Sequence, residues 1–280
     1  MAYLEDTRRR SAEKLTNAQL KETPDRSSIR PEWWGTAIII IAPLVIWEVL
    51  ARSGKISSLF FPAPSVIFLT SIQLITSGKL SIHLGITLWR VFIGFFLGGI
   101  SGLMLGLAMG WSRPLRMVID PLIAAAHPVP KIAILPLIMI FFGIGESSKI
   151  VVIAVATFFP MLINTVTGVR QINPIHFEVA ENYGASLNKI LTRVILPGSL
   201  PMVLTGARLA LNIALLLAIA VELVSAQEGL GAMIWLAWQT LRTEELYVSL
   251  FVTAALGMIL NFLLQRITLY LVPWQTEQKI

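Results

Sequence analysis

The sequence of 280 residues contains no cysteine and only three histidines. Without cysteine, disulfide bonds, thiolate metal sites and cysteine nucleophiles are excluded. His83, His127 and His176 lie in different segments and lack the paired spacing of metal ligands. The sequence therefore predicts no metal site and no catalytic residue. A membrane-embedded enzyme, the alternative from another functional class, would need polar residues clustered at one depth, whereas those of this chain are scattered.

Charge is also scarce in this chain. Charged side chains make up 14% of the residues, hydrophobic ones make up 55%, and the mean hydropathy is +0.75. Soluble domains average about 25% charged residues, so this composition indicates an integral membrane protein. A bilayer core of about 30 Å requires roughly 20 apolar residues per helix. The predicted fold is all-α and polytopic, with about six transmembrane helices over residues 35–51, 83–109, 121–142, 149–167, 201–224 and 246–272.

The distribution of the basic residues predicts how the protein is oriented in the membrane. The formal net charge is +6, and in membrane proteins such an excess gathers at the cytoplasmic helix ends, so no nucleic-acid partner is predicted. Four basic residues lie in or near the apolar runs: Arg90, Lys131, Arg208 and Arg266. If the N-terminus is cytoplasmic, few of the remaining basic residues lie on the outer side of the membrane. They are Arg52, Lys55, Lys79, Lys149 and Arg242. We therefore expect a multi-pass protein of the plasma (inner) membrane, surrounded by lipid, with both termini cytoplasmic.

Three regions follow from this pattern. Residues 1–34 are polar and are expected to form a mobile cytoplasmic tail. Residues 35–274 form the transmembrane domain, and residues 275–280 form a short cytoplasmic tail. The loop 170–197, between the fourth and fifth apolar runs, is placed in the cytoplasm.

Four ionisable residues at membrane depth are candidates for a translocation pathway, because such residues are costly in lipid. Arg90 can offer two parallel hydrogen bonds to an oxyanion, but it can equally reach the interface or form an internal ion pair. His127 and Lys131 flank prolines that argue against a straight helix, and irregular backbone at this depth either lines a cavity or is buried in protein. Glu222 suits a pathway, or an ion pair with Arg90 or Lys131.

Glycines recur at every fourth position of the second apolar run, so that they share one helix face. Small residues let a second helix approach closely within a membrane. Packing inside the chain, a seam between two copies and a moving contact all fit this stripe, which comprises Gly94, Gly98, Gly102, Gly106 and Gly110.

The loop 170–197 contains the segment EVAENYGASLNKILTRVILP, which is polar by comparison with its neighbours. Its apolar residues recur at steps of three or four, which predicts an amphipathic helix. Asn173, followed by proline, suits the helix start, Gly184 suits a break into two helices, and Pro197 suits the end. A surface connector between two spans has the same pattern. The predicted apolar face consists of Val179, Tyr183, Leu187, Ile190 and Val194.

This segment resembles the EAA loop of permease subunits of ABC importers. The resemblance rests on Glu178, Ala180, Gly184 and the ending Leu196-Pro197. Val179 stands where the family usually has its first alanine. The stretches PVPKIAILPLIMIFFGIGESSKI, FFPMLINTVTGVR and VELVSAQEGLG look like the branch that imports taurine, alkanesulfonates, nitrate or bicarbonate.

The resemblance implies a type I ABC importer permease fold with a cytoplasmic coupling helix. It further implies a homodimer, cytoplasmic ABC ATPase subunits that bind ATP and Mg, and an extracytoplasmic solute-binding protein. The chain contains no GxxxxGK[ST] phosphate loop, so no cofactor and no ATP hydrolysis are expected in it. A secondary transporter, or an importer permease for a pyrimidine-like or aromatic solute, is the alternative. The residues implied in coupling are Glu178, Ala180, Glu181, Gly184, Leu196 and Pro197.

Overall fold

The computed structural model describes residues 33–225 and 227–274, so most of the expected tails lies outside the described residues. The chain divides into two units, Met1–Ile56 and Ser57–Ile280. The described part of the first unit contains helix α2, Trp33–Arg52, which covers the first predicted span. Trp33 and Trp34, assigned to the tail from the sequence, are instead the first two residues of this helix.

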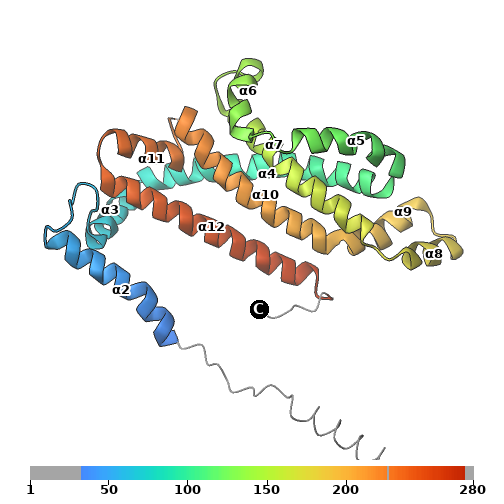
Figure 1. Cartoon of the computed structure of the whole chain (residues 1–280), viewed down its shortest axis with the longest axis horizontal. Coiled ribbons are helices and arrows are strands. Elements are labelled where there is room, and N and C mark those ends of the chain that lie inside the picture. The colour runs from blue at the N-terminus through green and yellow to red at the C-terminus, as the bar shows by residue number, and fades with distance from the viewer. Residues whose placement is uncertain (1–32, 226, 275–280) are drawn as a thin grey trace, which may run out of the picture. The chain divides into compact units, whose positions relative to one another are not determined.

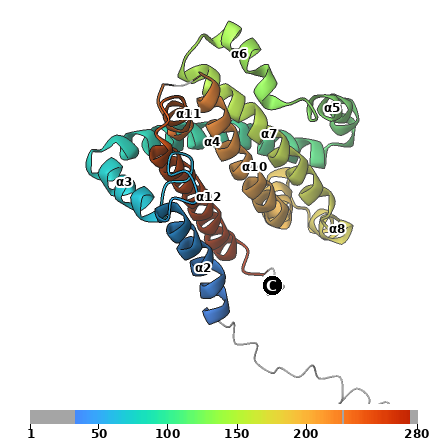
Figure 2. The ribbon, with the colours of Figure 1, turned by 60° about the vertical axis from the view of Figure 1, so that its left-hand side comes forward.

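Long helices form the core of the second unit (Figure 1). Helix α4, Lys79–Trp111, packs along α7, Glu146–Arg170, and α7 packs along α10, Leu196–Ser225. Helix α12, Thr243–Leu271, lies beside α10 in both ribbon views (Figure 2). The described residues of this unit form helices and turns without any strand.

Shorter helices occupy the two ends of the long ones. Helices α3 and α11 lie at one end, and α8 and α9 lie at the other (Figure 1). Their bounds, with those of the remaining elements, are α3 Pro64–Thr76, α5 Arg113–Ala126, the 3-10 helix η1 Lys131–Ile134, α6 Leu135–Phe142, α8 Pro174–Asn182, α9 Leu187–Ile190, the π-helix η2 Leu191–Ile195 and α11 Leu230–Gln239.

Four helical stretches in the described residues are long and apolar enough to cross a membrane, or up to five if one bent pair forms a single span. The four are Lys79–Trp111, Glu146–Arg170, Leu187–Ser225 and Thr243–Leu271. The bent pair, α5 with η1 and α6, turns by 89°. The bend, between Ala126 and Lys131, lies within the third predicted run, where the prolines argued against a straight helix. The sequence therefore located these segments, most of which the structure lengthens, whereas α2, which covers the first of the six predicted spans, is not among them.

The glycine stripe of α4 faces α7 along its whole length. A Cβ at Gly98 would overlap the backbone carbonyl of Ala154, and one at Gly102 would come within 2.5 Å of the Phe158 carbonyl oxygen. Gly94, Gly106 and Gly110 are equally close to side chains of α7. The two backbones approach each other so closely that a side chain at these positions has no room. The structure thus uses the stripe for packing within the chain.

Candidate functional site

The cytoplasmic loop predicted from the sequence forms a helix, a turn and a second helix. Helix α8 begins as predicted, because Asn173 accepts a hydrogen bond from the Ile175 backbone N–H at 3.1 Å and a proline fills the first helical position. The helix ends at Asn182, just before Gly184. Gly184 has φ +65°, a left-handed conformation that costs little only for glycine. Its N–H donates to the Glu181 carbonyl at 2.9 Å, which closes the turn.

The second helix does not end at Pro197, contrary to the sequence prediction. Helix α9 continues through the π-helix η2 into α10, so the stretch Leu187–Ser225 is one membrane-length helix. Proline lacks a backbone N–H, and its ring clashes with the carbonyl four residues earlier. The wider π turn accommodates both effects: the Leu196 N–H donates to the Leu191 carbonyl, one residue further back than in an α-helix. The segment is therefore rigidly joined to a transmembrane helix.

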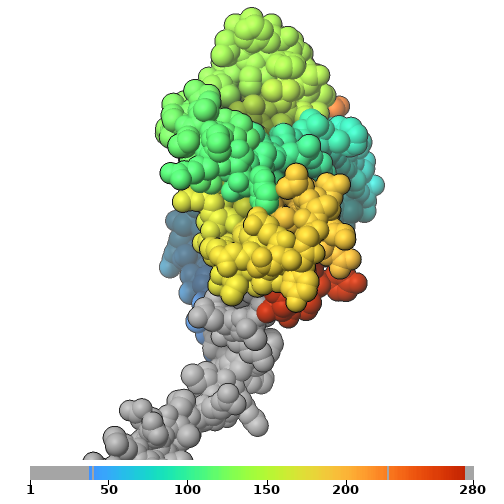
Figure 3. Space-filling model, turned by 90° about the vertical axis from the view of Figure 1, so that its right-hand side faces the viewer, coloured from blue at the N-terminus to red at the C-terminus, as the bar shows by residue number. Residues whose placement is uncertain are grey.

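The predicted apolar face of this loop divides into a buried part and an exposed part. Ile190 is buried with Val169 and Ile195, a residue outside the predicted face, and Val194 is partly buried against them. Tyr183 and Leu187, in contrast, are 88% and 72% exposed, and Val179 is exposed as well. Because Gly184 interrupts the helix, the periodicity of α8 does not continue into α9. These three exposed side chains, which we call the apolar patch, belong to the segment coloured yellow to gold in Figure 3.

The residues implied in coupling share this region of the chain. Glu178, Glu181 and Gly184 are exposed, and Leu196 is partly exposed at 39%. Ala180 and Pro197 line a groove of about 450 Å³. The other residues along this groove are Ile172, His176, Val179, Arg193, Val194, Gly198 and Trp274. The structure thus gathers all six at one end of the long helices.

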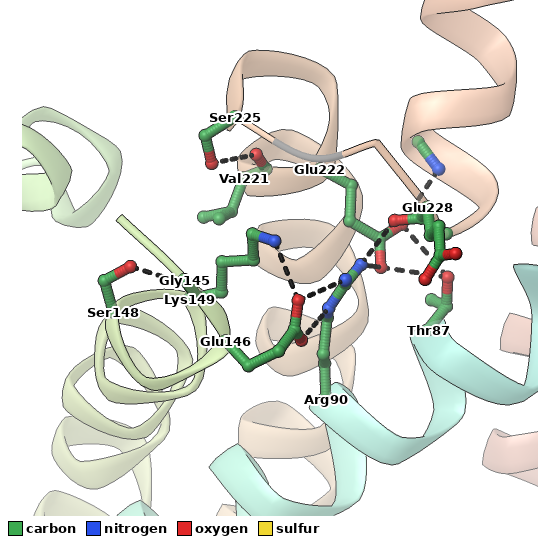
Figure 4. A network of polar contacts seen from close by, with 12 residues as sticks. Thr87, Arg90, Gly145, Glu146, Ser148, Lys149, Val221, Glu222, Ser225 and Glu228 are labelled. Atoms are coloured by element: carbon green, nitrogen blue, oxygen red, sulfur yellow. Dashed lines mark hydrogen bonds and ion pairs between the residues drawn. The ribbon is translucent and has the colours of Figure 1, made fainter. Parts of the chain in front are cut away.

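A buried charge network occupies the opposite end of α7 and is centred on Arg90 (Figure 4). Arg90 is 2% exposed, and its guanidinium contacts the Glu222 carboxylate at 2.7 Å, where Glu222 is fully buried. It also donates two hydrogen bonds of 2.7 Å to the two carboxylate oxygens of Glu146. A fourth bond of 2.6 Å goes to the Glu228 backbone carbonyl. Lys149 reaches Glu146 at 2.8 Å, so that this half-exposed carboxylate joins two cations.

Glu222 is held in place by polar groups from two elements, α4 and α11. The Thr87 hydroxyl contacts both of its oxygens at 3.0 Å, and the Gly231 N–H donates to it at 2.9 Å. A Cβ at Gly229 would overlap the Glu222 carboxylate, and the φ of Gly229 is +115°. Glycine is thus required at this turn for space and for backbone conformation. The network ties α4, α7 and α10 to the start of α11.

The ion-pair alternative for Arg90 and Glu222 is therefore the one that the structure shows. An external oxyanion that takes two N–H groups would have to displace a partner of Arg90, since four of the five guanidinium N–H groups are already in use. Lys131 does not pair with Glu222. Its ammonium instead donates to the carbonyls of Ala126, His127 and Val129 at 2.7–3.0 Å.

His127 and Lys131 lie together at the bend between α5 and α6, apart from Arg90. The Lys131 ammonium is 4.4 Å from the centre of the Phe159 ring, and the His127 ring lies 5.4 Å from the same ring. The prolines at the bend leave several carbonyls without helical partners. Lys131 satisfies these carbonyls, so the structure gives it a role in stabilising the bend.

Sequence reasoning missed several members of the network. Glu146 was passed over because it lies at the first position of α7 rather than inside an apolar run. The one signal was its spacing of three residues from Lys149, which favours an ion pair on one helix face. Thr87 was unremarkable in sequence, and α11 was too short to be counted as a span.

Comparisons with known proteins agree with this architecture. Residues 94–277 match the family described as "Binding-protein-dependent transport system inner membrane component". The putative aliphatic sulfonates transport permease protein SsuC of Bacillus subtilis is 34% identical over 263 residues, which cover 94% of this chain and 95% of that protein. The taurine transport system permease protein TauC of Escherichia coli is 35% identical over 239 residues, covering 84% of this chain and 87% of that protein.

A solved structure shares the fold. The chain resembles an inward-facing structure of the MetNI methionine ABC transporter with a TM-score of 0.59 and 22% identity, over 68% of this chain and 94% of that one. At this identity the likeness shows the fold alone. The matched arrangement is that of type I importer permeases.

Proposed function

The chain belongs to the family of binding-protein-dependent transport system inner membrane components, as a permease subunit of an ABC importer, and from this premise we propose that it imports a sulfonate such as taurine or an alkanesulfonate. Two relatives named for sulfonate and taurine transport match most of this chain at 34% and 35% identity. Their similarity favours a small organic sulfonate over nitrate or bicarbonate, and an ABC importer over a secondary transporter.

In this proposal two copies of the chain form the transport pathway. An extracytoplasmic solute-binding protein delivers the sulfonate, and two ATPase subunits dock on the cytoplasmic side. The ATPase subunits bind ATP and Mg and hydrolyse the ATP, since this chain carries no phosphate loop. The α8–α9 end is cytoplasmic, together with both termini, and the Arg90 network faces outward, in the plasma (inner) membrane.

The observation that carries this proposal is the exposed apolar patch at the α8–α9 end, whose Leu187 lies on a rigid helix. Tyr183 and Leu187 present apolar surface at the α8–α9 end, where a protein surface in water would ordinarily be polar. Leu187 begins the continuous helix that runs to Ser225, about 58 Å at 1.5 Å per residue. A partner that grips this patch and moves therefore moves the whole helix. ATP-driven closure of two docked ATPases is such a movement.

Docking is tested by copurification of the ATPase with variants of the patch. Replacing Leu187 with Asp and Tyr183 with Ala removes apolar surface without emptying the core, because both side chains point outward. We expect the ATPase to be lost from the purified complex and taurine uptake to stop, while the permease still folds. Tyr270→Ala is the matched control, since Tyr270 is 83% exposed but belongs to α12. A double variant that retains its ATPase and transports normally would contradict the docking surface.

The turn is tested by Gly184→Trp. Nothing lies within 4 Å of a Cβ at Gly184, so the substitution acts through the left-handed backbone and not through a clash with neighbours. We expect a shifted α8 and reduced coupling of ATP hydrolysis to uptake. Unchanged transport and unchanged ATPase copurification would show that the turn is not needed.

The substrate is tested by uptake into proteoliposomes that contain the permease, its ATPase and its solute-binding protein. Radiolabelled taurine and alkanesulfonates are compared with nitrate, bicarbonate and a pyrimidine. Saturable, ATP-dependent sulfonate uptake is the expected result. Uptake of the pyrimidine alone would overturn the sulfonate proposal and leave the importer fold intact.

A further inference from the structure

Arg208 is an arginine inside a membrane helix that has no partner in the described residues. It is the thirteenth residue of α10, about 18 Å along the helix from Leu196. Its side chain is exposed, and it makes no hydrogen bond and no ion pair with any described residue. Ionisable residues in membrane helices face a bundle interior or a water-filled cavity, because a charge facing lipid is costly. The described part of a single copy therefore leaves this charge without compensation.

Other polar side chains lie near Arg208 on the exposed side of α10, which also carries Leu209 and Leu216. Thr205, Arg208 and Asn212 are all exposed, and their spacing places them within about 60° of one another around α10. Asn212 also accepts a hydrogen bond of 2.7 Å from the side-chain amide of Asn261 in α12. We call these four residues the α10 polar stripe. The exposed face of α4 is more apolar, with Phe96, Leu97, Ile100 and Met104 beside Ser101.

We infer that the α10 polar stripe lines the aqueous translocation pathway and that the Arg208 guanidinium binds the sulfonate group of the solute as it passes. This inference rests on the proposed sulfonate import. A guanidinium presents several N–H donors in a fixed plane, which suits an oxyanion with more than one oxygen. Arg208 is also the only basic residue of α10. It therefore supplies the positive charge that an anion needs at this depth.

An oxyanion other than a sulfonate could bind the Arg208 guanidinium through the same hydrogen bonds. The phosphate of a lipid headgroup carries similar oxygens, and an arginine can extend its side chain toward the interface. The position of Asn212 and Asn261 favours the pathway. These amides lie a full turn further from the α8–α9 end than Arg208, carry no charge and are too short to reach headgroups.

The absence of cysteine allows a direct test of water access. Single variants Thr205→Cys, Arg208→Cys and Asn212→Cys each carry one thiol in an otherwise cysteine-free chain. The transporter is reconstituted with its ATPase and solute-binding protein and treated with sulfonatoethyl methanethiosulfonate, a charged thiol reagent that does not enter lipid. Ile100→Cys is the control, since Ile100 is exposed on an apolar face. We expect labelling of the three stripe variants and none of the control, with slower labelling when taurine is being transported.

Taurine uptake by variants of Arg208 tests whether its positive charge is needed for transport. Arg208→Gln should lower taurine uptake about tenfold or more, the effect of losing one charge-assisted contact with the bound anion. Arg208→Lys should retain part of the activity, and Arg266→Gln, which alters another exposed arginine in a membrane helix, should transport normally. Complex yield and binding-protein docking should stay unchanged in all three.

The outcomes separate this inference from the proposed function. If the unaltered transporter takes up no sulfonate, the proposed function fails, and the inference fails with it. If it takes up sulfonate but Arg208→Gln transports at the normal rate, or Arg208→Cys remains unlabelled like Ile100→Cys, Arg208 faces lipid and only the inference is overturned. Labelling that taurine does not slow, combined with normal uptake by Arg208→Gln, would likewise overturn it.

Discussion

Arg90 and Arg208 are both arginines within long membrane helices, and their surroundings are opposite. Arg90 is buried and bonded to two carboxylates and a backbone carbonyl. Arg208 is exposed and has no partner in the described part of the chain. In a low-dielectric environment a charge must be neutralised by its own protein or by something that the protein binds. The comparison therefore assigns Arg90 to structure and Arg208 to the solute.

Replacing Arg90 with Gln should produce the largest effect on stability. Removing one member of a buried ion pair leaves the other charge without compensation, at a cost of about 3–5 kcal/mol. Thermal melting of the detergent-purified protein should show this loss. Adding Glu222→Gln should recover part of it, because the two residues form one unit. An Arg90→Gln protein that melts like the unaltered one would break the comparison.

Gly98→Leu should cost about 1–3 kcal/mol or more through overpacking. The new side chain would overlap the Ala154 carbonyl and push α4 away from α7, the helix that carries Glu146. Gly85→Leu in the same helix is the control, since nothing lies within 4 Å of a Cβ there. Melting temperatures of the two variants should differ clearly, and equal values would show that the two helices can separate freely.

Glu146→Gln should have a smaller effect, about 1 kcal/mol, because this carboxylate is 51% exposed and water replaces part of what is lost. The same melting assay compares it with Glu222→Gln, whose carboxylate is fully buried. We expect Glu222→Gln to be the more destabilised of the two. The reverse order would mean that the burial of a carboxylate does not determine how much it contributes to the stability of the protein.

Arg208→Gln should leave stability within about 0.5 kcal/mol of the unaltered protein, as expected of an exposed side chain without partners. Its uptake of taurine should nevertheless fall. This separation of stability from transport sharpens the contrast with Arg90. A melting temperature as low as that of Arg90→Gln would reveal a structural role for Arg208.

Much of the loop 170–197 was predictable because its signals are local. The Asn173 cap and the left-handed Gly184 depend on neighbouring residues alone. The continuation of the helix through Pro197 was not predictable, since it requires a π turn held by packing of Ile190 and Ile195. Likewise, the sequence assigned Tyr183 and Leu187 to one helix face with Ile190. This was wrong because the turn at Gly184 separates α8 from α9, so one helical periodicity does not apply to both.

The sequence by itself determined the membrane class, the positions of the long apolar helices, the close-packing glycine face and the location of the α8–α9 segment. These properties follow from composition and from residues close together in the chain. Only the tertiary structure decided which charges are neutralised. Arg90, Glu146 and Glu222 are far apart in sequence and meet because three helices pack together. That same packing leaves Arg208 on an open face, so it separates a structural arginine from one that is available to the solute.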